Sequence, residues 1–379
     1  MEYRTLGKTG LRVSEIGFGA EWMPGDGSLT REVTHAAADA GVNIVDCWMA
    51  DPTVRRALGA AVCERRAHWI VQGHIGSTWQ DGQYVRTRDL DQVKPAWEFL
   101  LECFGGHIEL GMIHYVDSVS EFDDIMAGPF IDYVRAQKTA GRIDHIGLST
   151  HNPDVALAAC DHDDIAMIMF SLNPAFDMLP PSEDINDLFA ETYSEGLSNI
   201  DPRRQELHRI CEQRGVGLTV MKPFAGGRLL DAEKSPFGAA MSTSQCIAYC
   251  LARPAVASVM AGYRNVEELA GCLAFETASA EERDFTGVLA QSPSHAYFGQ
   301  CIYCGHCQPC AVGIDIAAVN KFGDLARAHN AVPESVAGHY NALDAHAGDC
   351  VGCRICEPNC PFGVHIAERM EETTQLFGY

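Results

Sequence analysis

Eight short apolar segments recur through the first 290 residues of this 379-residue chain, and segments of helical periodicity lie between them. The apolar segments are residues 14–19, 42–46, 69–74, 109–115, 145–149, 166–172, 217–222 and 257–262. The helical segments include residues 31–40, 90–104, 129–140, 203–214 and 242–252. Continuous apolar strands that alternate with helices indicate a parallel sheet buried on both faces. Eight such units predict a (β/α)8 barrel of the TIM type.

The longest stretch without a predicted strand covers residues 173–202 and is rich in Pro, Asp and Glu. Most connections in compact domains are much shorter, and longer ones are often functional. We expect this stretch to form a loop or lid over the barrel mouth.

Polar side chains stand where the predicted strands end. They are Asp46, His74, His114, Ser149, Asn173 and Lys222. Active sites of such barrels lie at the carboxyl ends of the strands, and four of these six side chains are titratable. The sequence therefore predicts an active site at this end. Two histidines and one carboxylate also leave open a two-His-one-carboxylate metal site.

Eight of the sixteen cysteines fall into two short runs near the C-terminus. The first run consists of Cys301, Cys304, Cys307 and Cys310. The second run consists of Cys350, Cys353, Cys356 and Cys360. The second run is followed by Pro361 and has the C-x2-C-x2-C-x3-C-P spacing of bacterial ferredoxins. The first run has a last spacing of two residues, and Ala311 replaces the proline.

In ferredoxins with two clusters, three cysteines of a run bind one [4Fe–4S] cluster and the fourth binds the other. We assign one cluster to Cys301, Cys304, Cys307 and Cys360. We assign the other to Cys310, Cys350, Cys353 and Cys356. Two structural zinc sites are the alternative, but zinc sites usually pair two distant C-x2-C units. Residues 291–379 are thus predicted to form a small helical ferredoxin-type domain, with a helix near 314–328 and a loop to 346.

The formal net charge is -23, which disfavours nucleic acid and anionic membranes as partners and suits binding to basic protein surfaces. We find no signal peptide and no apolar run long enough to span a membrane. A cytoplasmic location is expected, where thiols stay reduced. The remaining eight cysteines are therefore predicted to be mainly core residues rather than disulfides.

Five segments resemble the aldo-keto reductase superfamily: YRTLGKTGLRVSEIGFG, GVNIVD, IELGMIHYVD, GRIDHIGLSTHN and VMKPFAGGRLL. Together with the cysteine runs, the whole chain resembles the iron–sulfur branch of that superfamily. The resemblance implies that residues 1–290 form a barrel of this type. It also implies that Asp46 and His114 are the catalytic aspartate and histidine of an Asp, Tyr, Lys and His tetrad.

The chain departs from the resembled family at the other two positions. Asp51 stands where the tyrosine is expected, and His74 stands where the lysine is expected. The segment after His74 carries Tyr84, a candidate that returns a phenol to the site, and Arg86 and Arg88, candidates that clamp an anion. His74 is then predicted to exchange protons with the substrate itself.

The sequence contains only part of a nicotinamide-binding site. Ser149 lies in the fifth-strand segment. Lys222 and Arg264 are candidate phosphate contacts, and Gly226 and Gly227 allow close approach of the backbone. Gly271 and Cys272 replace the Glu-Asn pair that grips adenine in the resembled family, so we expect weak NADP(H) binding at best. No glycine-rich flavin fingerprint is present, although a flavin is not excluded.

We expect an iron–sulfur oxidoreductase, suited to anaerobic work, that passes electrons between two [4Fe–4S] clusters and a small substrate or NADP(H) at the barrel mouth. Its expected partners are that substrate and a redox protein such as a ferredoxin, flavodoxin or reductase. Two alternatives stay open. One is a lyase or isomerase that uses Asp46, His74 and His114 with structural clusters. The other is an electron-transfer subunit without small-molecule turnover.

Overall fold

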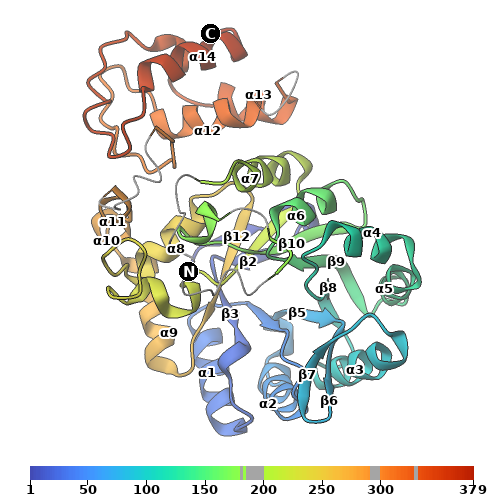
Figure 1. Ribbon diagram of the computed structural model, residues 1–379. Helices are drawn as coiled ribbons and strands as arrows, with labels where there is room; N and C mark the ends of the chain where they lie inside the picture. Colours follow the sequence, from blue (N-terminus) through green and yellow to red (C-terminus); the bar gives the residue numbers. More distant parts are fainter. Residues whose placement is uncertain (180–181, 185–199, 291–298, 328–331) are drawn as a thin grey trace.

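Eight parallel strands close into a barrel in the computed structural model, which describes residues 1–179, 182–184, 200–290, 299–327 and 332–379 (Figure 1). The strands are β3 (Ile16–Gly19), β4 (Ile44–Cys47), β5 (Ile70–Ile75), β8 (Ile108–Ile113), β9 (Ile143–Thr150), β10 (Ile165–Ser171), β11 (Gly217–Met221) and β12 (Val256–Gly262). Ring closure pairs β12 with β3, so that Gly262 lies beside Gly19. The predicted barrel and its eight strands are confirmed, with ends that differ by one or two residues.

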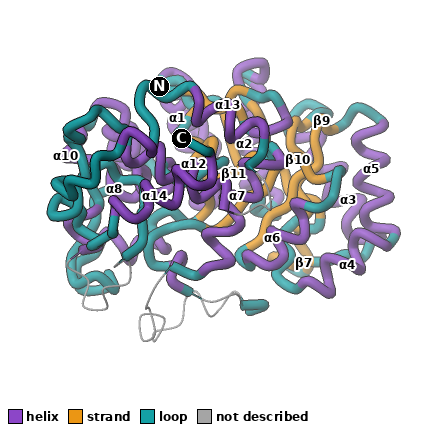
Figure 2. The backbone as a smooth tube through the Cα atoms, turned by 90° about the horizontal axis from the view of Figure 1, so that it is seen from above, coloured by secondary structure: helices purple, strands orange, loops and turns teal. Residues whose placement is uncertain are grey.

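Helices cover the outside of the barrel (Figure 2). They are α1 (Gly27–Asp39), α2 (Pro52–Cys63), α3 (Leu90–Cys103), α4 (Val119–Ala127), α5 (Pro129–Thr139), α6 (Pro153–Cys160), α7 (Pro202–Arg214), α8 (Thr243–Leu251), α9 (Val266–Leu273), α10 (Ala280–Arg283) and α11 (Thr286–Ala290). Most of the longer ones begin at a side chain that accepts a backbone N–H, as Asp26, Asn152 and Ser242 do. The five predicted helices are all present.

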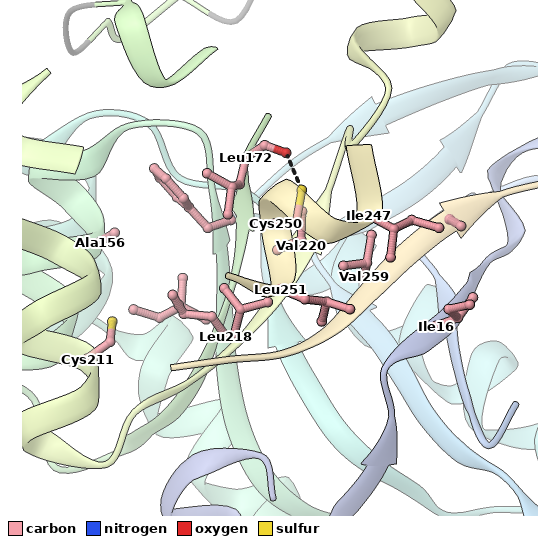
Figure 3. Packing of buried hydrophobic residues seen from close by; sticks show 14 of the residues in the cluster. Ile16, Ala156, Leu172, Cys211, Leu218, Val220, Ile247, Cys250, Leu251 and Val259 are labelled. Atoms are coloured by element: carbon pink, nitrogen blue, oxygen red, sulfur yellow. Dashed lines mark hydrogen bonds between the residues drawn. The ribbon is translucent and has the colours of Figure 1, made fainter. Parts of the chain in front are cut away.

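Apolar side chains between strands and helices form the main core. Figure 3 shows Val220 and Val259 of the barrel strands facing Ile247 and Leu251 of α8. Cys250 is buried beside them, and its thiol donates to the carbonyl of Leu172 over 3.4 Å. Most cysteines outside the two runs are buried in this way, as predicted, whereas Cys63 is exposed.

The N-terminal hairpin of β1 (Tyr3–Thr5) and β2 (Arg12–Ser14) precedes the barrel. Its Leu6 and Val13 are fully buried in a second apolar cluster with strand residues such as Met167. This packing fixes the first turn of the chain against the end of the barrel that lies opposite the strand carboxyl ends.

The segment after β5 differs from the predicted loop, because it forms a hairpin of β6 (Ser77–Gln80) and β7 (Gln83–Arg86). The two turn residues, Asp81 and Gly82, have φ of 51° and 78°. Two consecutive positive φ values are typical of a type I′ turn, for which Asp-Gly is a favoured sequence. This turn chemistry, rather than strand periodicity, makes the hairpin.

Only part of the predicted lid is described. Residues 173–178 are buried and include a short 3-10 turn, Phe176–Met178. Most of the lid, residues 180–181 and 185–199, lies outside the described residues. The predicted boundary between residues 290 and 291 also adjoins an undescribed segment, 291–298, so the exact boundary stays a prediction.

Three helices and two cysteine loops form a C-terminal unit beside α7 (Figure 1). The helices are α12 (Ile316–Arg327), α13 (Glu334–Asn341) and α14 (Ile366–Phe377). The predicted loop before residue 346 was wrong at α13. Tyr340 of α13 explains it, because its ring is fully buried and stacks on Phe377 at 3.8 Å between ring centroids. No described helix is long and apolar enough to cross a membrane.

Candidate functional site

The carboxyl ends of three neighbouring strands bring together Asp46, His74 and His114. Asp46 lies on β4, His74 on β5, and His114 follows β8 directly. All three side chains are buried, with exposed fractions of 4% or less. The structure therefore places these sequence-predicted residues in one cluster at the barrel mouth.

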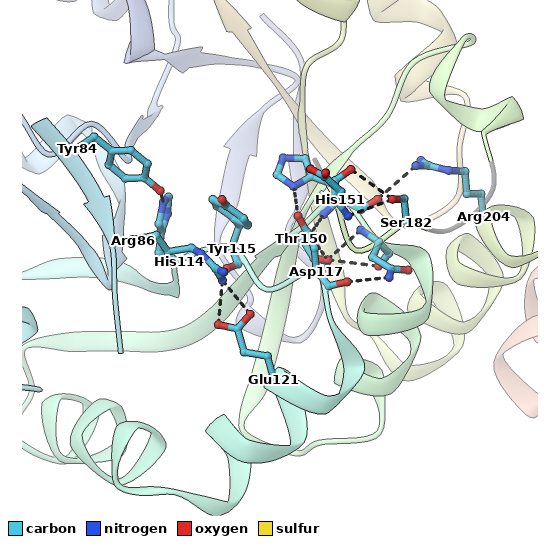
Figure 4. A network of polar contacts seen from close by, with 12 residues as sticks. Tyr84, Arg86, His114, Tyr115, Asp117, Glu121, Thr150, His151, Ser182 and Arg204 are labelled. Atoms are coloured by element: carbon cyan, nitrogen blue, oxygen red, sulfur yellow. Dashed lines mark hydrogen bonds and ion pairs between the residues drawn. The ribbon is translucent and has the colours of Figure 1, made fainter. Parts of the chain in front are cut away.

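Tyr84 of β7 extends the cluster into a chain of four hydrogen-bonded side chains. The hydroxyl of Tyr84 lies 2.6 Å from His114 Nε2, as Figure 4 shows. His114 Nδ1 lies 2.8 Å from His74 Nδ1, and His74 Nε2 lies 2.9 Å from Asp46 Oδ1. Each histidine thus uses both ring nitrogens within the chain. We call these four residues the relay.

The relay geometry bears on the metal alternative. The nitrogens of His74 and His114 face each other or face Asp46 and Tyr84, instead of pointing at one shared position. Among the described residues, no three His, Cys, Asp or Glu side chains are grouped as ligands of a single ion. The four side chains form a linear chain of hydrogen bonds and do not converge on one position, as the ligands of a two-His-one-carboxylate site would.

Two neighbours that sequence reasoning missed hold the relay in place. Gln72 Nε2 donates to Asp46 Oδ1 over 2.7 Å, and Thr219 Oγ1 donates to Gln72 Oε1 over 3.1 Å. Trp48 stacks on His114 at 5.9 Å between ring centroids and meets Tyr84 edge-on at 5.3 Å. Gln72 was detectable, because it lies two residues before His74 and so faces the same side of the strand.

Burial sets the protonation of the relay. It lowers the pKa of His114 well below its usual range, and the nearby His74, Arg88 and Arg86 act in the same direction. Burial also raises the pKa of Tyr84 above its usual range, although Arg86 and Arg88 partly oppose this. At neutral pH His114 is therefore uncharged and Tyr84 keeps its proton.

The predicted anion clamp already holds a carboxylate of the chain. Arg86 Nη1 lies 2.8 Å from both carboxylate oxygens of Glu121, and Arg88 Nε donates to the same group over 3.1 Å. Both guanidinium groups also donate to the carbonyl of Tyr115, at 3.0 and 2.8 Å. These arginines anchor the hairpin base to α4, so a substrate anion would compete with Glu121.

A second buried polar pair lies beside the relay. Asp117 accepts from the backbone N–H and lies 2.8 Å from Nδ1 of His151. Burial acts to raise the pKa of Asp117, but the charge and hydrogen bonds of His151 hold it below its usual range. The ring of Tyr115 contacts both His151 and His114, at 5.4 and 5.2 Å between ring centroids (Figure 4). None of these contacts was predicted.

The predicted nicotinamide contacts are only partly brought together. Lys222 follows β11, and burial lowers its pKa while Glu21 and Asp117 oppose that shift. Gly226 and Gly227 follow, are exposed, and have φ of 67° and 89°. This turn therefore leaves the backbone open to a ligand.

Two other predicted contacts are placed less favourably. Arg264 is exposed, and its guanidinium is paired with Glu268. The Ser149 hydroxyl is buried and has no hydrogen-bond partner among the described residues, so it is available to a bound molecule. Asp51, where the resembled family has tyrosine, accepts from Thr53 N–H and caps α2.

The two cysteine loops share one backbone conformation. In each loop the residues on either side of the second cysteine have positive φ: 59° and 79° at Tyr303 and Gly305, and 66° and 56° at Gly352 and Arg354. The helices that follow the loops, α12 and α14, start fifty residues apart in sequence. The unit is thus built from two copies of one loop-and-helix motif.

The structure groups the cysteines across the two copies. Cys310 of the first loop lines one cavity with Cys350, Cys353 and Cys356 of the second. Burial, followed by the charges of Cys301 and Cys304, raises the pKa of Cys307 to about 12, and Cys360 adds to this effect. The cavity groups the cysteines of one of the two crossed sets that the ferredoxin spacing predicts, and the binding of clusters stays a prediction. Four thiolates per set suit a cubane, in which each thiolate binds its own iron.

The chain is similar to several known proteins. No family model matches the chain. The chain is 24% identical over 293 residues to the uncharacterized oxidoreductase YqkF of Bacillus subtilis (strain 168), covering 71% of this chain and 89% of that protein. Aldo-keto reductase AKR11C1 from Bacillus halodurans, in its holo form, is 22% identical with a TM-score of 0.60.

That comparison covers 78% of this chain and 98% of AKR11C1. The apo form of the same protein gives 21% identity and a TM-score of 0.54 over the same shares. These likenesses to solved structures show the fold alone. The barrel of this chain therefore has the fold of the aldo-keto reductases.

Proposed function

We propose that this chain is an iron–sulfur oxidoreductase, in which the relay moves protons to or from a small substrate while two [4Fe–4S] clusters pass electrons. The relay itself is the observation that carries the proposal. Buried titratable side chains are costly unless paired, and linked groups with shifted pKa values mark functional sites. Likeness to an oxidoreductase in sequence and to aldo-keto reductases in fold supports the redox class.

The relay can deliver one proton to a substrate oxygen at Tyr84. With His74 protonated, its Nδ1–H donates to His114 Nδ1, His114 Nε2–H donates to Tyr84, and the Tyr84 hydroxyl donates to the substrate. When the Tyr84 proton leaves, each group behind it passes one proton forward. Both histidines end neutral, and His74 Nε2–H still donates to the Asp46 carboxylate.

The same path runs in reverse for a substrate that loses a proton. Tyr84 then accepts from the substrate and passes its own proton to His114. The charge comes to rest on His74, where the Asp46 carboxylate stabilises the imidazolium. Neutral His114 carries the proton without holding a charge, which agrees with its lowered pKa.

The two crossed cysteine sets are the proposed cluster ligands. One consists of Cys301, Cys304, Cys307 and Cys360. The other consists of Cys310, Cys350, Cys353 and Cys356. Such clusters supply electrons one at a time. We also propose a redox protein such as a ferredoxin, flavodoxin or reductase as the electron partner, with basic residues that suit the net charge of -23.

NADP(H) binding is proposed to be weak. Lys222 and the Gly226–Gly227 turn follow β11, but Arg264 is paired with Glu268 and no Glu-Asn pair stands at Gly271 and Cys272. A dissociation constant below the micromolar range for NADPH, measured by fluorescence, would contradict this part of the proposal.

Metal analysis of anaerobically purified protein tests the clusters. We expect about eight iron and eight acid-labile sulfide per chain, as two cubanes require. Cys350→Ala should remove one cluster preferentially, whereas Cys63→Ala, which changes an exposed cysteine outside both sets, should remove none. Zinc in place of iron, or four iron in total, would overturn the assignment.

Substrate-dependent reoxidation separates the redox function from the alternatives. Clusters are reduced chemically, the reductant is removed, and small carbonyl compounds are added while the visible absorbance is followed. Reoxidation that requires both substrate and an intact relay supports the proposal. Turnover of a substrate without any change in the clusters would favour a lyase or isomerase, in which Asp46, His74 and His114 perform acid–base chemistry.

A further inference from the structure

A cavity of about 110 Å³ lies between the barrel and the C-terminal unit. The barrel contributes Arg204 and Arg209 of α7 and Arg253, which follows α8. The C-terminal unit contributes Cys301, Tyr303 and Arg369. The cavity therefore joins α7 directly to a cysteine of the first proposed cluster.

This cavity is positively charged in an acidic protein. The described residues that line it include four arginines and two carboxylates, Asp177 and Asp324, so the charged side chains of the lining sum to a formal charge of +2. Arg204 is almost fully buried, and its Nε has no hydrogen-bond partner among the described residues. The Nε atom of Arg209 is also buried and has no hydrogen-bond partner among the described residues. Buried cations without enough acidic partners imply an anion nearby.

Asp324 organises the cations on the side of the C-terminal unit. It accepts from Arg369 Nη2 over 2.5 Å, from Arg327 Nη1 over 2.8 Å, and from the Tyr303 hydroxyl over 2.9 Å. Arg369 Nε also donates to Asn320 over 2.8 Å. These bonds hold the Arg369 guanidinium in one position on the wall that it shares with Cys301.

The duplicated loop-and-helix motif provides an internal comparison. The residues equivalent to Tyr303, Arg369 and Asp324 near the second cysteine set are Gly352, Val319 and Thr374. None of them carries a charge. The cation beside Cys353 is Arg354, whose side chain is 51% exposed. The charged network is therefore specific to the first set.

The two cysteine loops also differ in their exposure to solvent. Ile302 of the first loop is 1% exposed, whereas the equivalent Val351 is 66% exposed. The first set faces the barrel and the second faces outward. Because water screens charge, Arg354 acts on its neighbours much more weakly than the cavity arginines do.

We infer that this cavity is an electrostatic junction, in which arginines of both units raise the reduction potential of the cluster held by Cys301, Cys304, Cys307 and Cys360. The inference rests on the proposed function. Reduction adds one negative charge to a cluster, and fixed positive charges in a buried site stabilise that charge. The barrel-facing cluster is thereby favoured as the place where electrons arrive from the outer one.

Redox titration of the whole protein, followed by electron paramagnetic resonance, tests the junction. Arg369→Gln is expected to lower the potential of one cluster, on the order of a tenfold change in its reduced-to-oxidised ratio, which is 59 mV for one electron. Arg354→Gln is the matched control and should shift the other cluster by much less. Arg369→Lys keeps the charge and should keep the potential.

Arg209→Gln extends the test across the cavity. A change on α7 that lowers the potential of the same cluster supports the junction, because only a charge facing that cluster can do so. The inference is overturned if Arg369→Gln leaves both potentials unchanged, or if Arg354→Gln has an equal effect, in protein with full iron and sulfide content. Protein without iron contradicts the proposed function instead.

Discussion

His74 stands where the resembled reductases have lysine, and the structure shows what the exchange allows. An ammonium group only donates hydrogen bonds at neutral pH, whereas an imidazole donates at one nitrogen and accepts at the other. His74 uses both, toward Asp46 and toward His114. His74 can therefore give a proton to His114 or take one from it while its Nε2–H stays on Asp46, whereas a lysine ammonium keeps its proton near neutral pH.

The hydroxyl of Tyr84 is the terminal group of that path, so its removal tests the relay with the least disturbance. Tyr84→Phe keeps the ring against Trp48 and is expected to lower turnover by at least about a hundredfold, the usual weight of one acid–base group. His74→Ala and His114→Ala should cost as much. Steady-state kinetics, with cluster content measured in each variant, gives the result.

Tyr133→Phe is the matched control, because the Tyr133 hydroxyl has no hydrogen-bond partner among the described residues. It should leave turnover unchanged. If Tyr84→Phe and Tyr133→Phe behaved alike, Tyr84 would be a packing residue and the relay would end at His114.

At the scale of elements, the β6–β7 hairpin decides where the phenol lies. Ser77 Oγ donates to the carbonyl of Trp48 over 2.6 Å, and Thr87 N donates to Gly76 over 3.0 Å at the hairpin base. The base is thus tied to the loop after β4. At the tip, the Asp81-Gly82 turn reverses the chain and Gln80 donates to Gln92 of α3, and Tyr84 lies two residues beyond the turn.

Gly82 offers a test of this positioning. With φ of 78°, this site accepts glycine or asparagine readily but strains a β-branched residue. Gly82→Val is expected to reduce turnover severalfold or more through displacement of Tyr84, with little change in melting temperature. Gly82→Asn should retain most of the activity. A large loss of barrel stability in Gly82→Val would show that the hairpin supports the fold instead.

Strands and helices with a regular apolar pattern could be predicted from the sequence. Elements that depend on turn residues or on tertiary contacts could not. The eight barrel strands are mainly apolar, and their ends placed Asp46, His74 and His114 correctly. The hairpin has only four residues a strand, so no periodicity reveals it, although Asp-Gly was a usable signal. Helix α13 depends on the tertiary stacking of Tyr340, which no local pattern contains.

Contacts between distant segments could not be predicted either, because no local sequence pattern contains them. The Asp117–His151 pair joins residues 34 positions apart, and the interface cavity joins α7 to a loop nearly a hundred residues later. Such contacts follow from how whole units pack. The proposed crossing of the cysteine sets is different, because it follows from a spacing rule and stays a prediction.

At the scale of the whole molecule, α7 lies between the barrel and the C-terminal unit, and it carries a buried histidine. Burial lowers the pKa of His208 to about 4, with Arg253 and Arg204 acting in the same direction and Asp177 opposing them. The unfolded value is about 6.5. Between these pH values the unfolded chain binds a proton that the folded protein does not.

Stability should therefore be complete with respect to His208 above about pH 6.5 and fall as the pH drops toward 4. His208→Leu is expected to reduce the loss of melting temperature between pH 7 and pH 5, measured by calorimetry on anaerobic protein. His107→Gln changes a histidine whose side chain is 38% exposed and should keep the original pH dependence. Equal acid sensitivity in all three proteins would contradict the assignment.

The hairpin that carries Tyr84 pairs only within itself and adds no strand to the ring of eight. Mutations, insertions or deletions in it leave the hydrogen bonds that close the barrel intact. A lineage can therefore try new proton donors at this position while the scaffold stays folded. The hairpin that carries the proton donor and the strands that form the barrel can therefore change independently. A barrel of this kind can acquire a new reaction through a few changes in the hairpin.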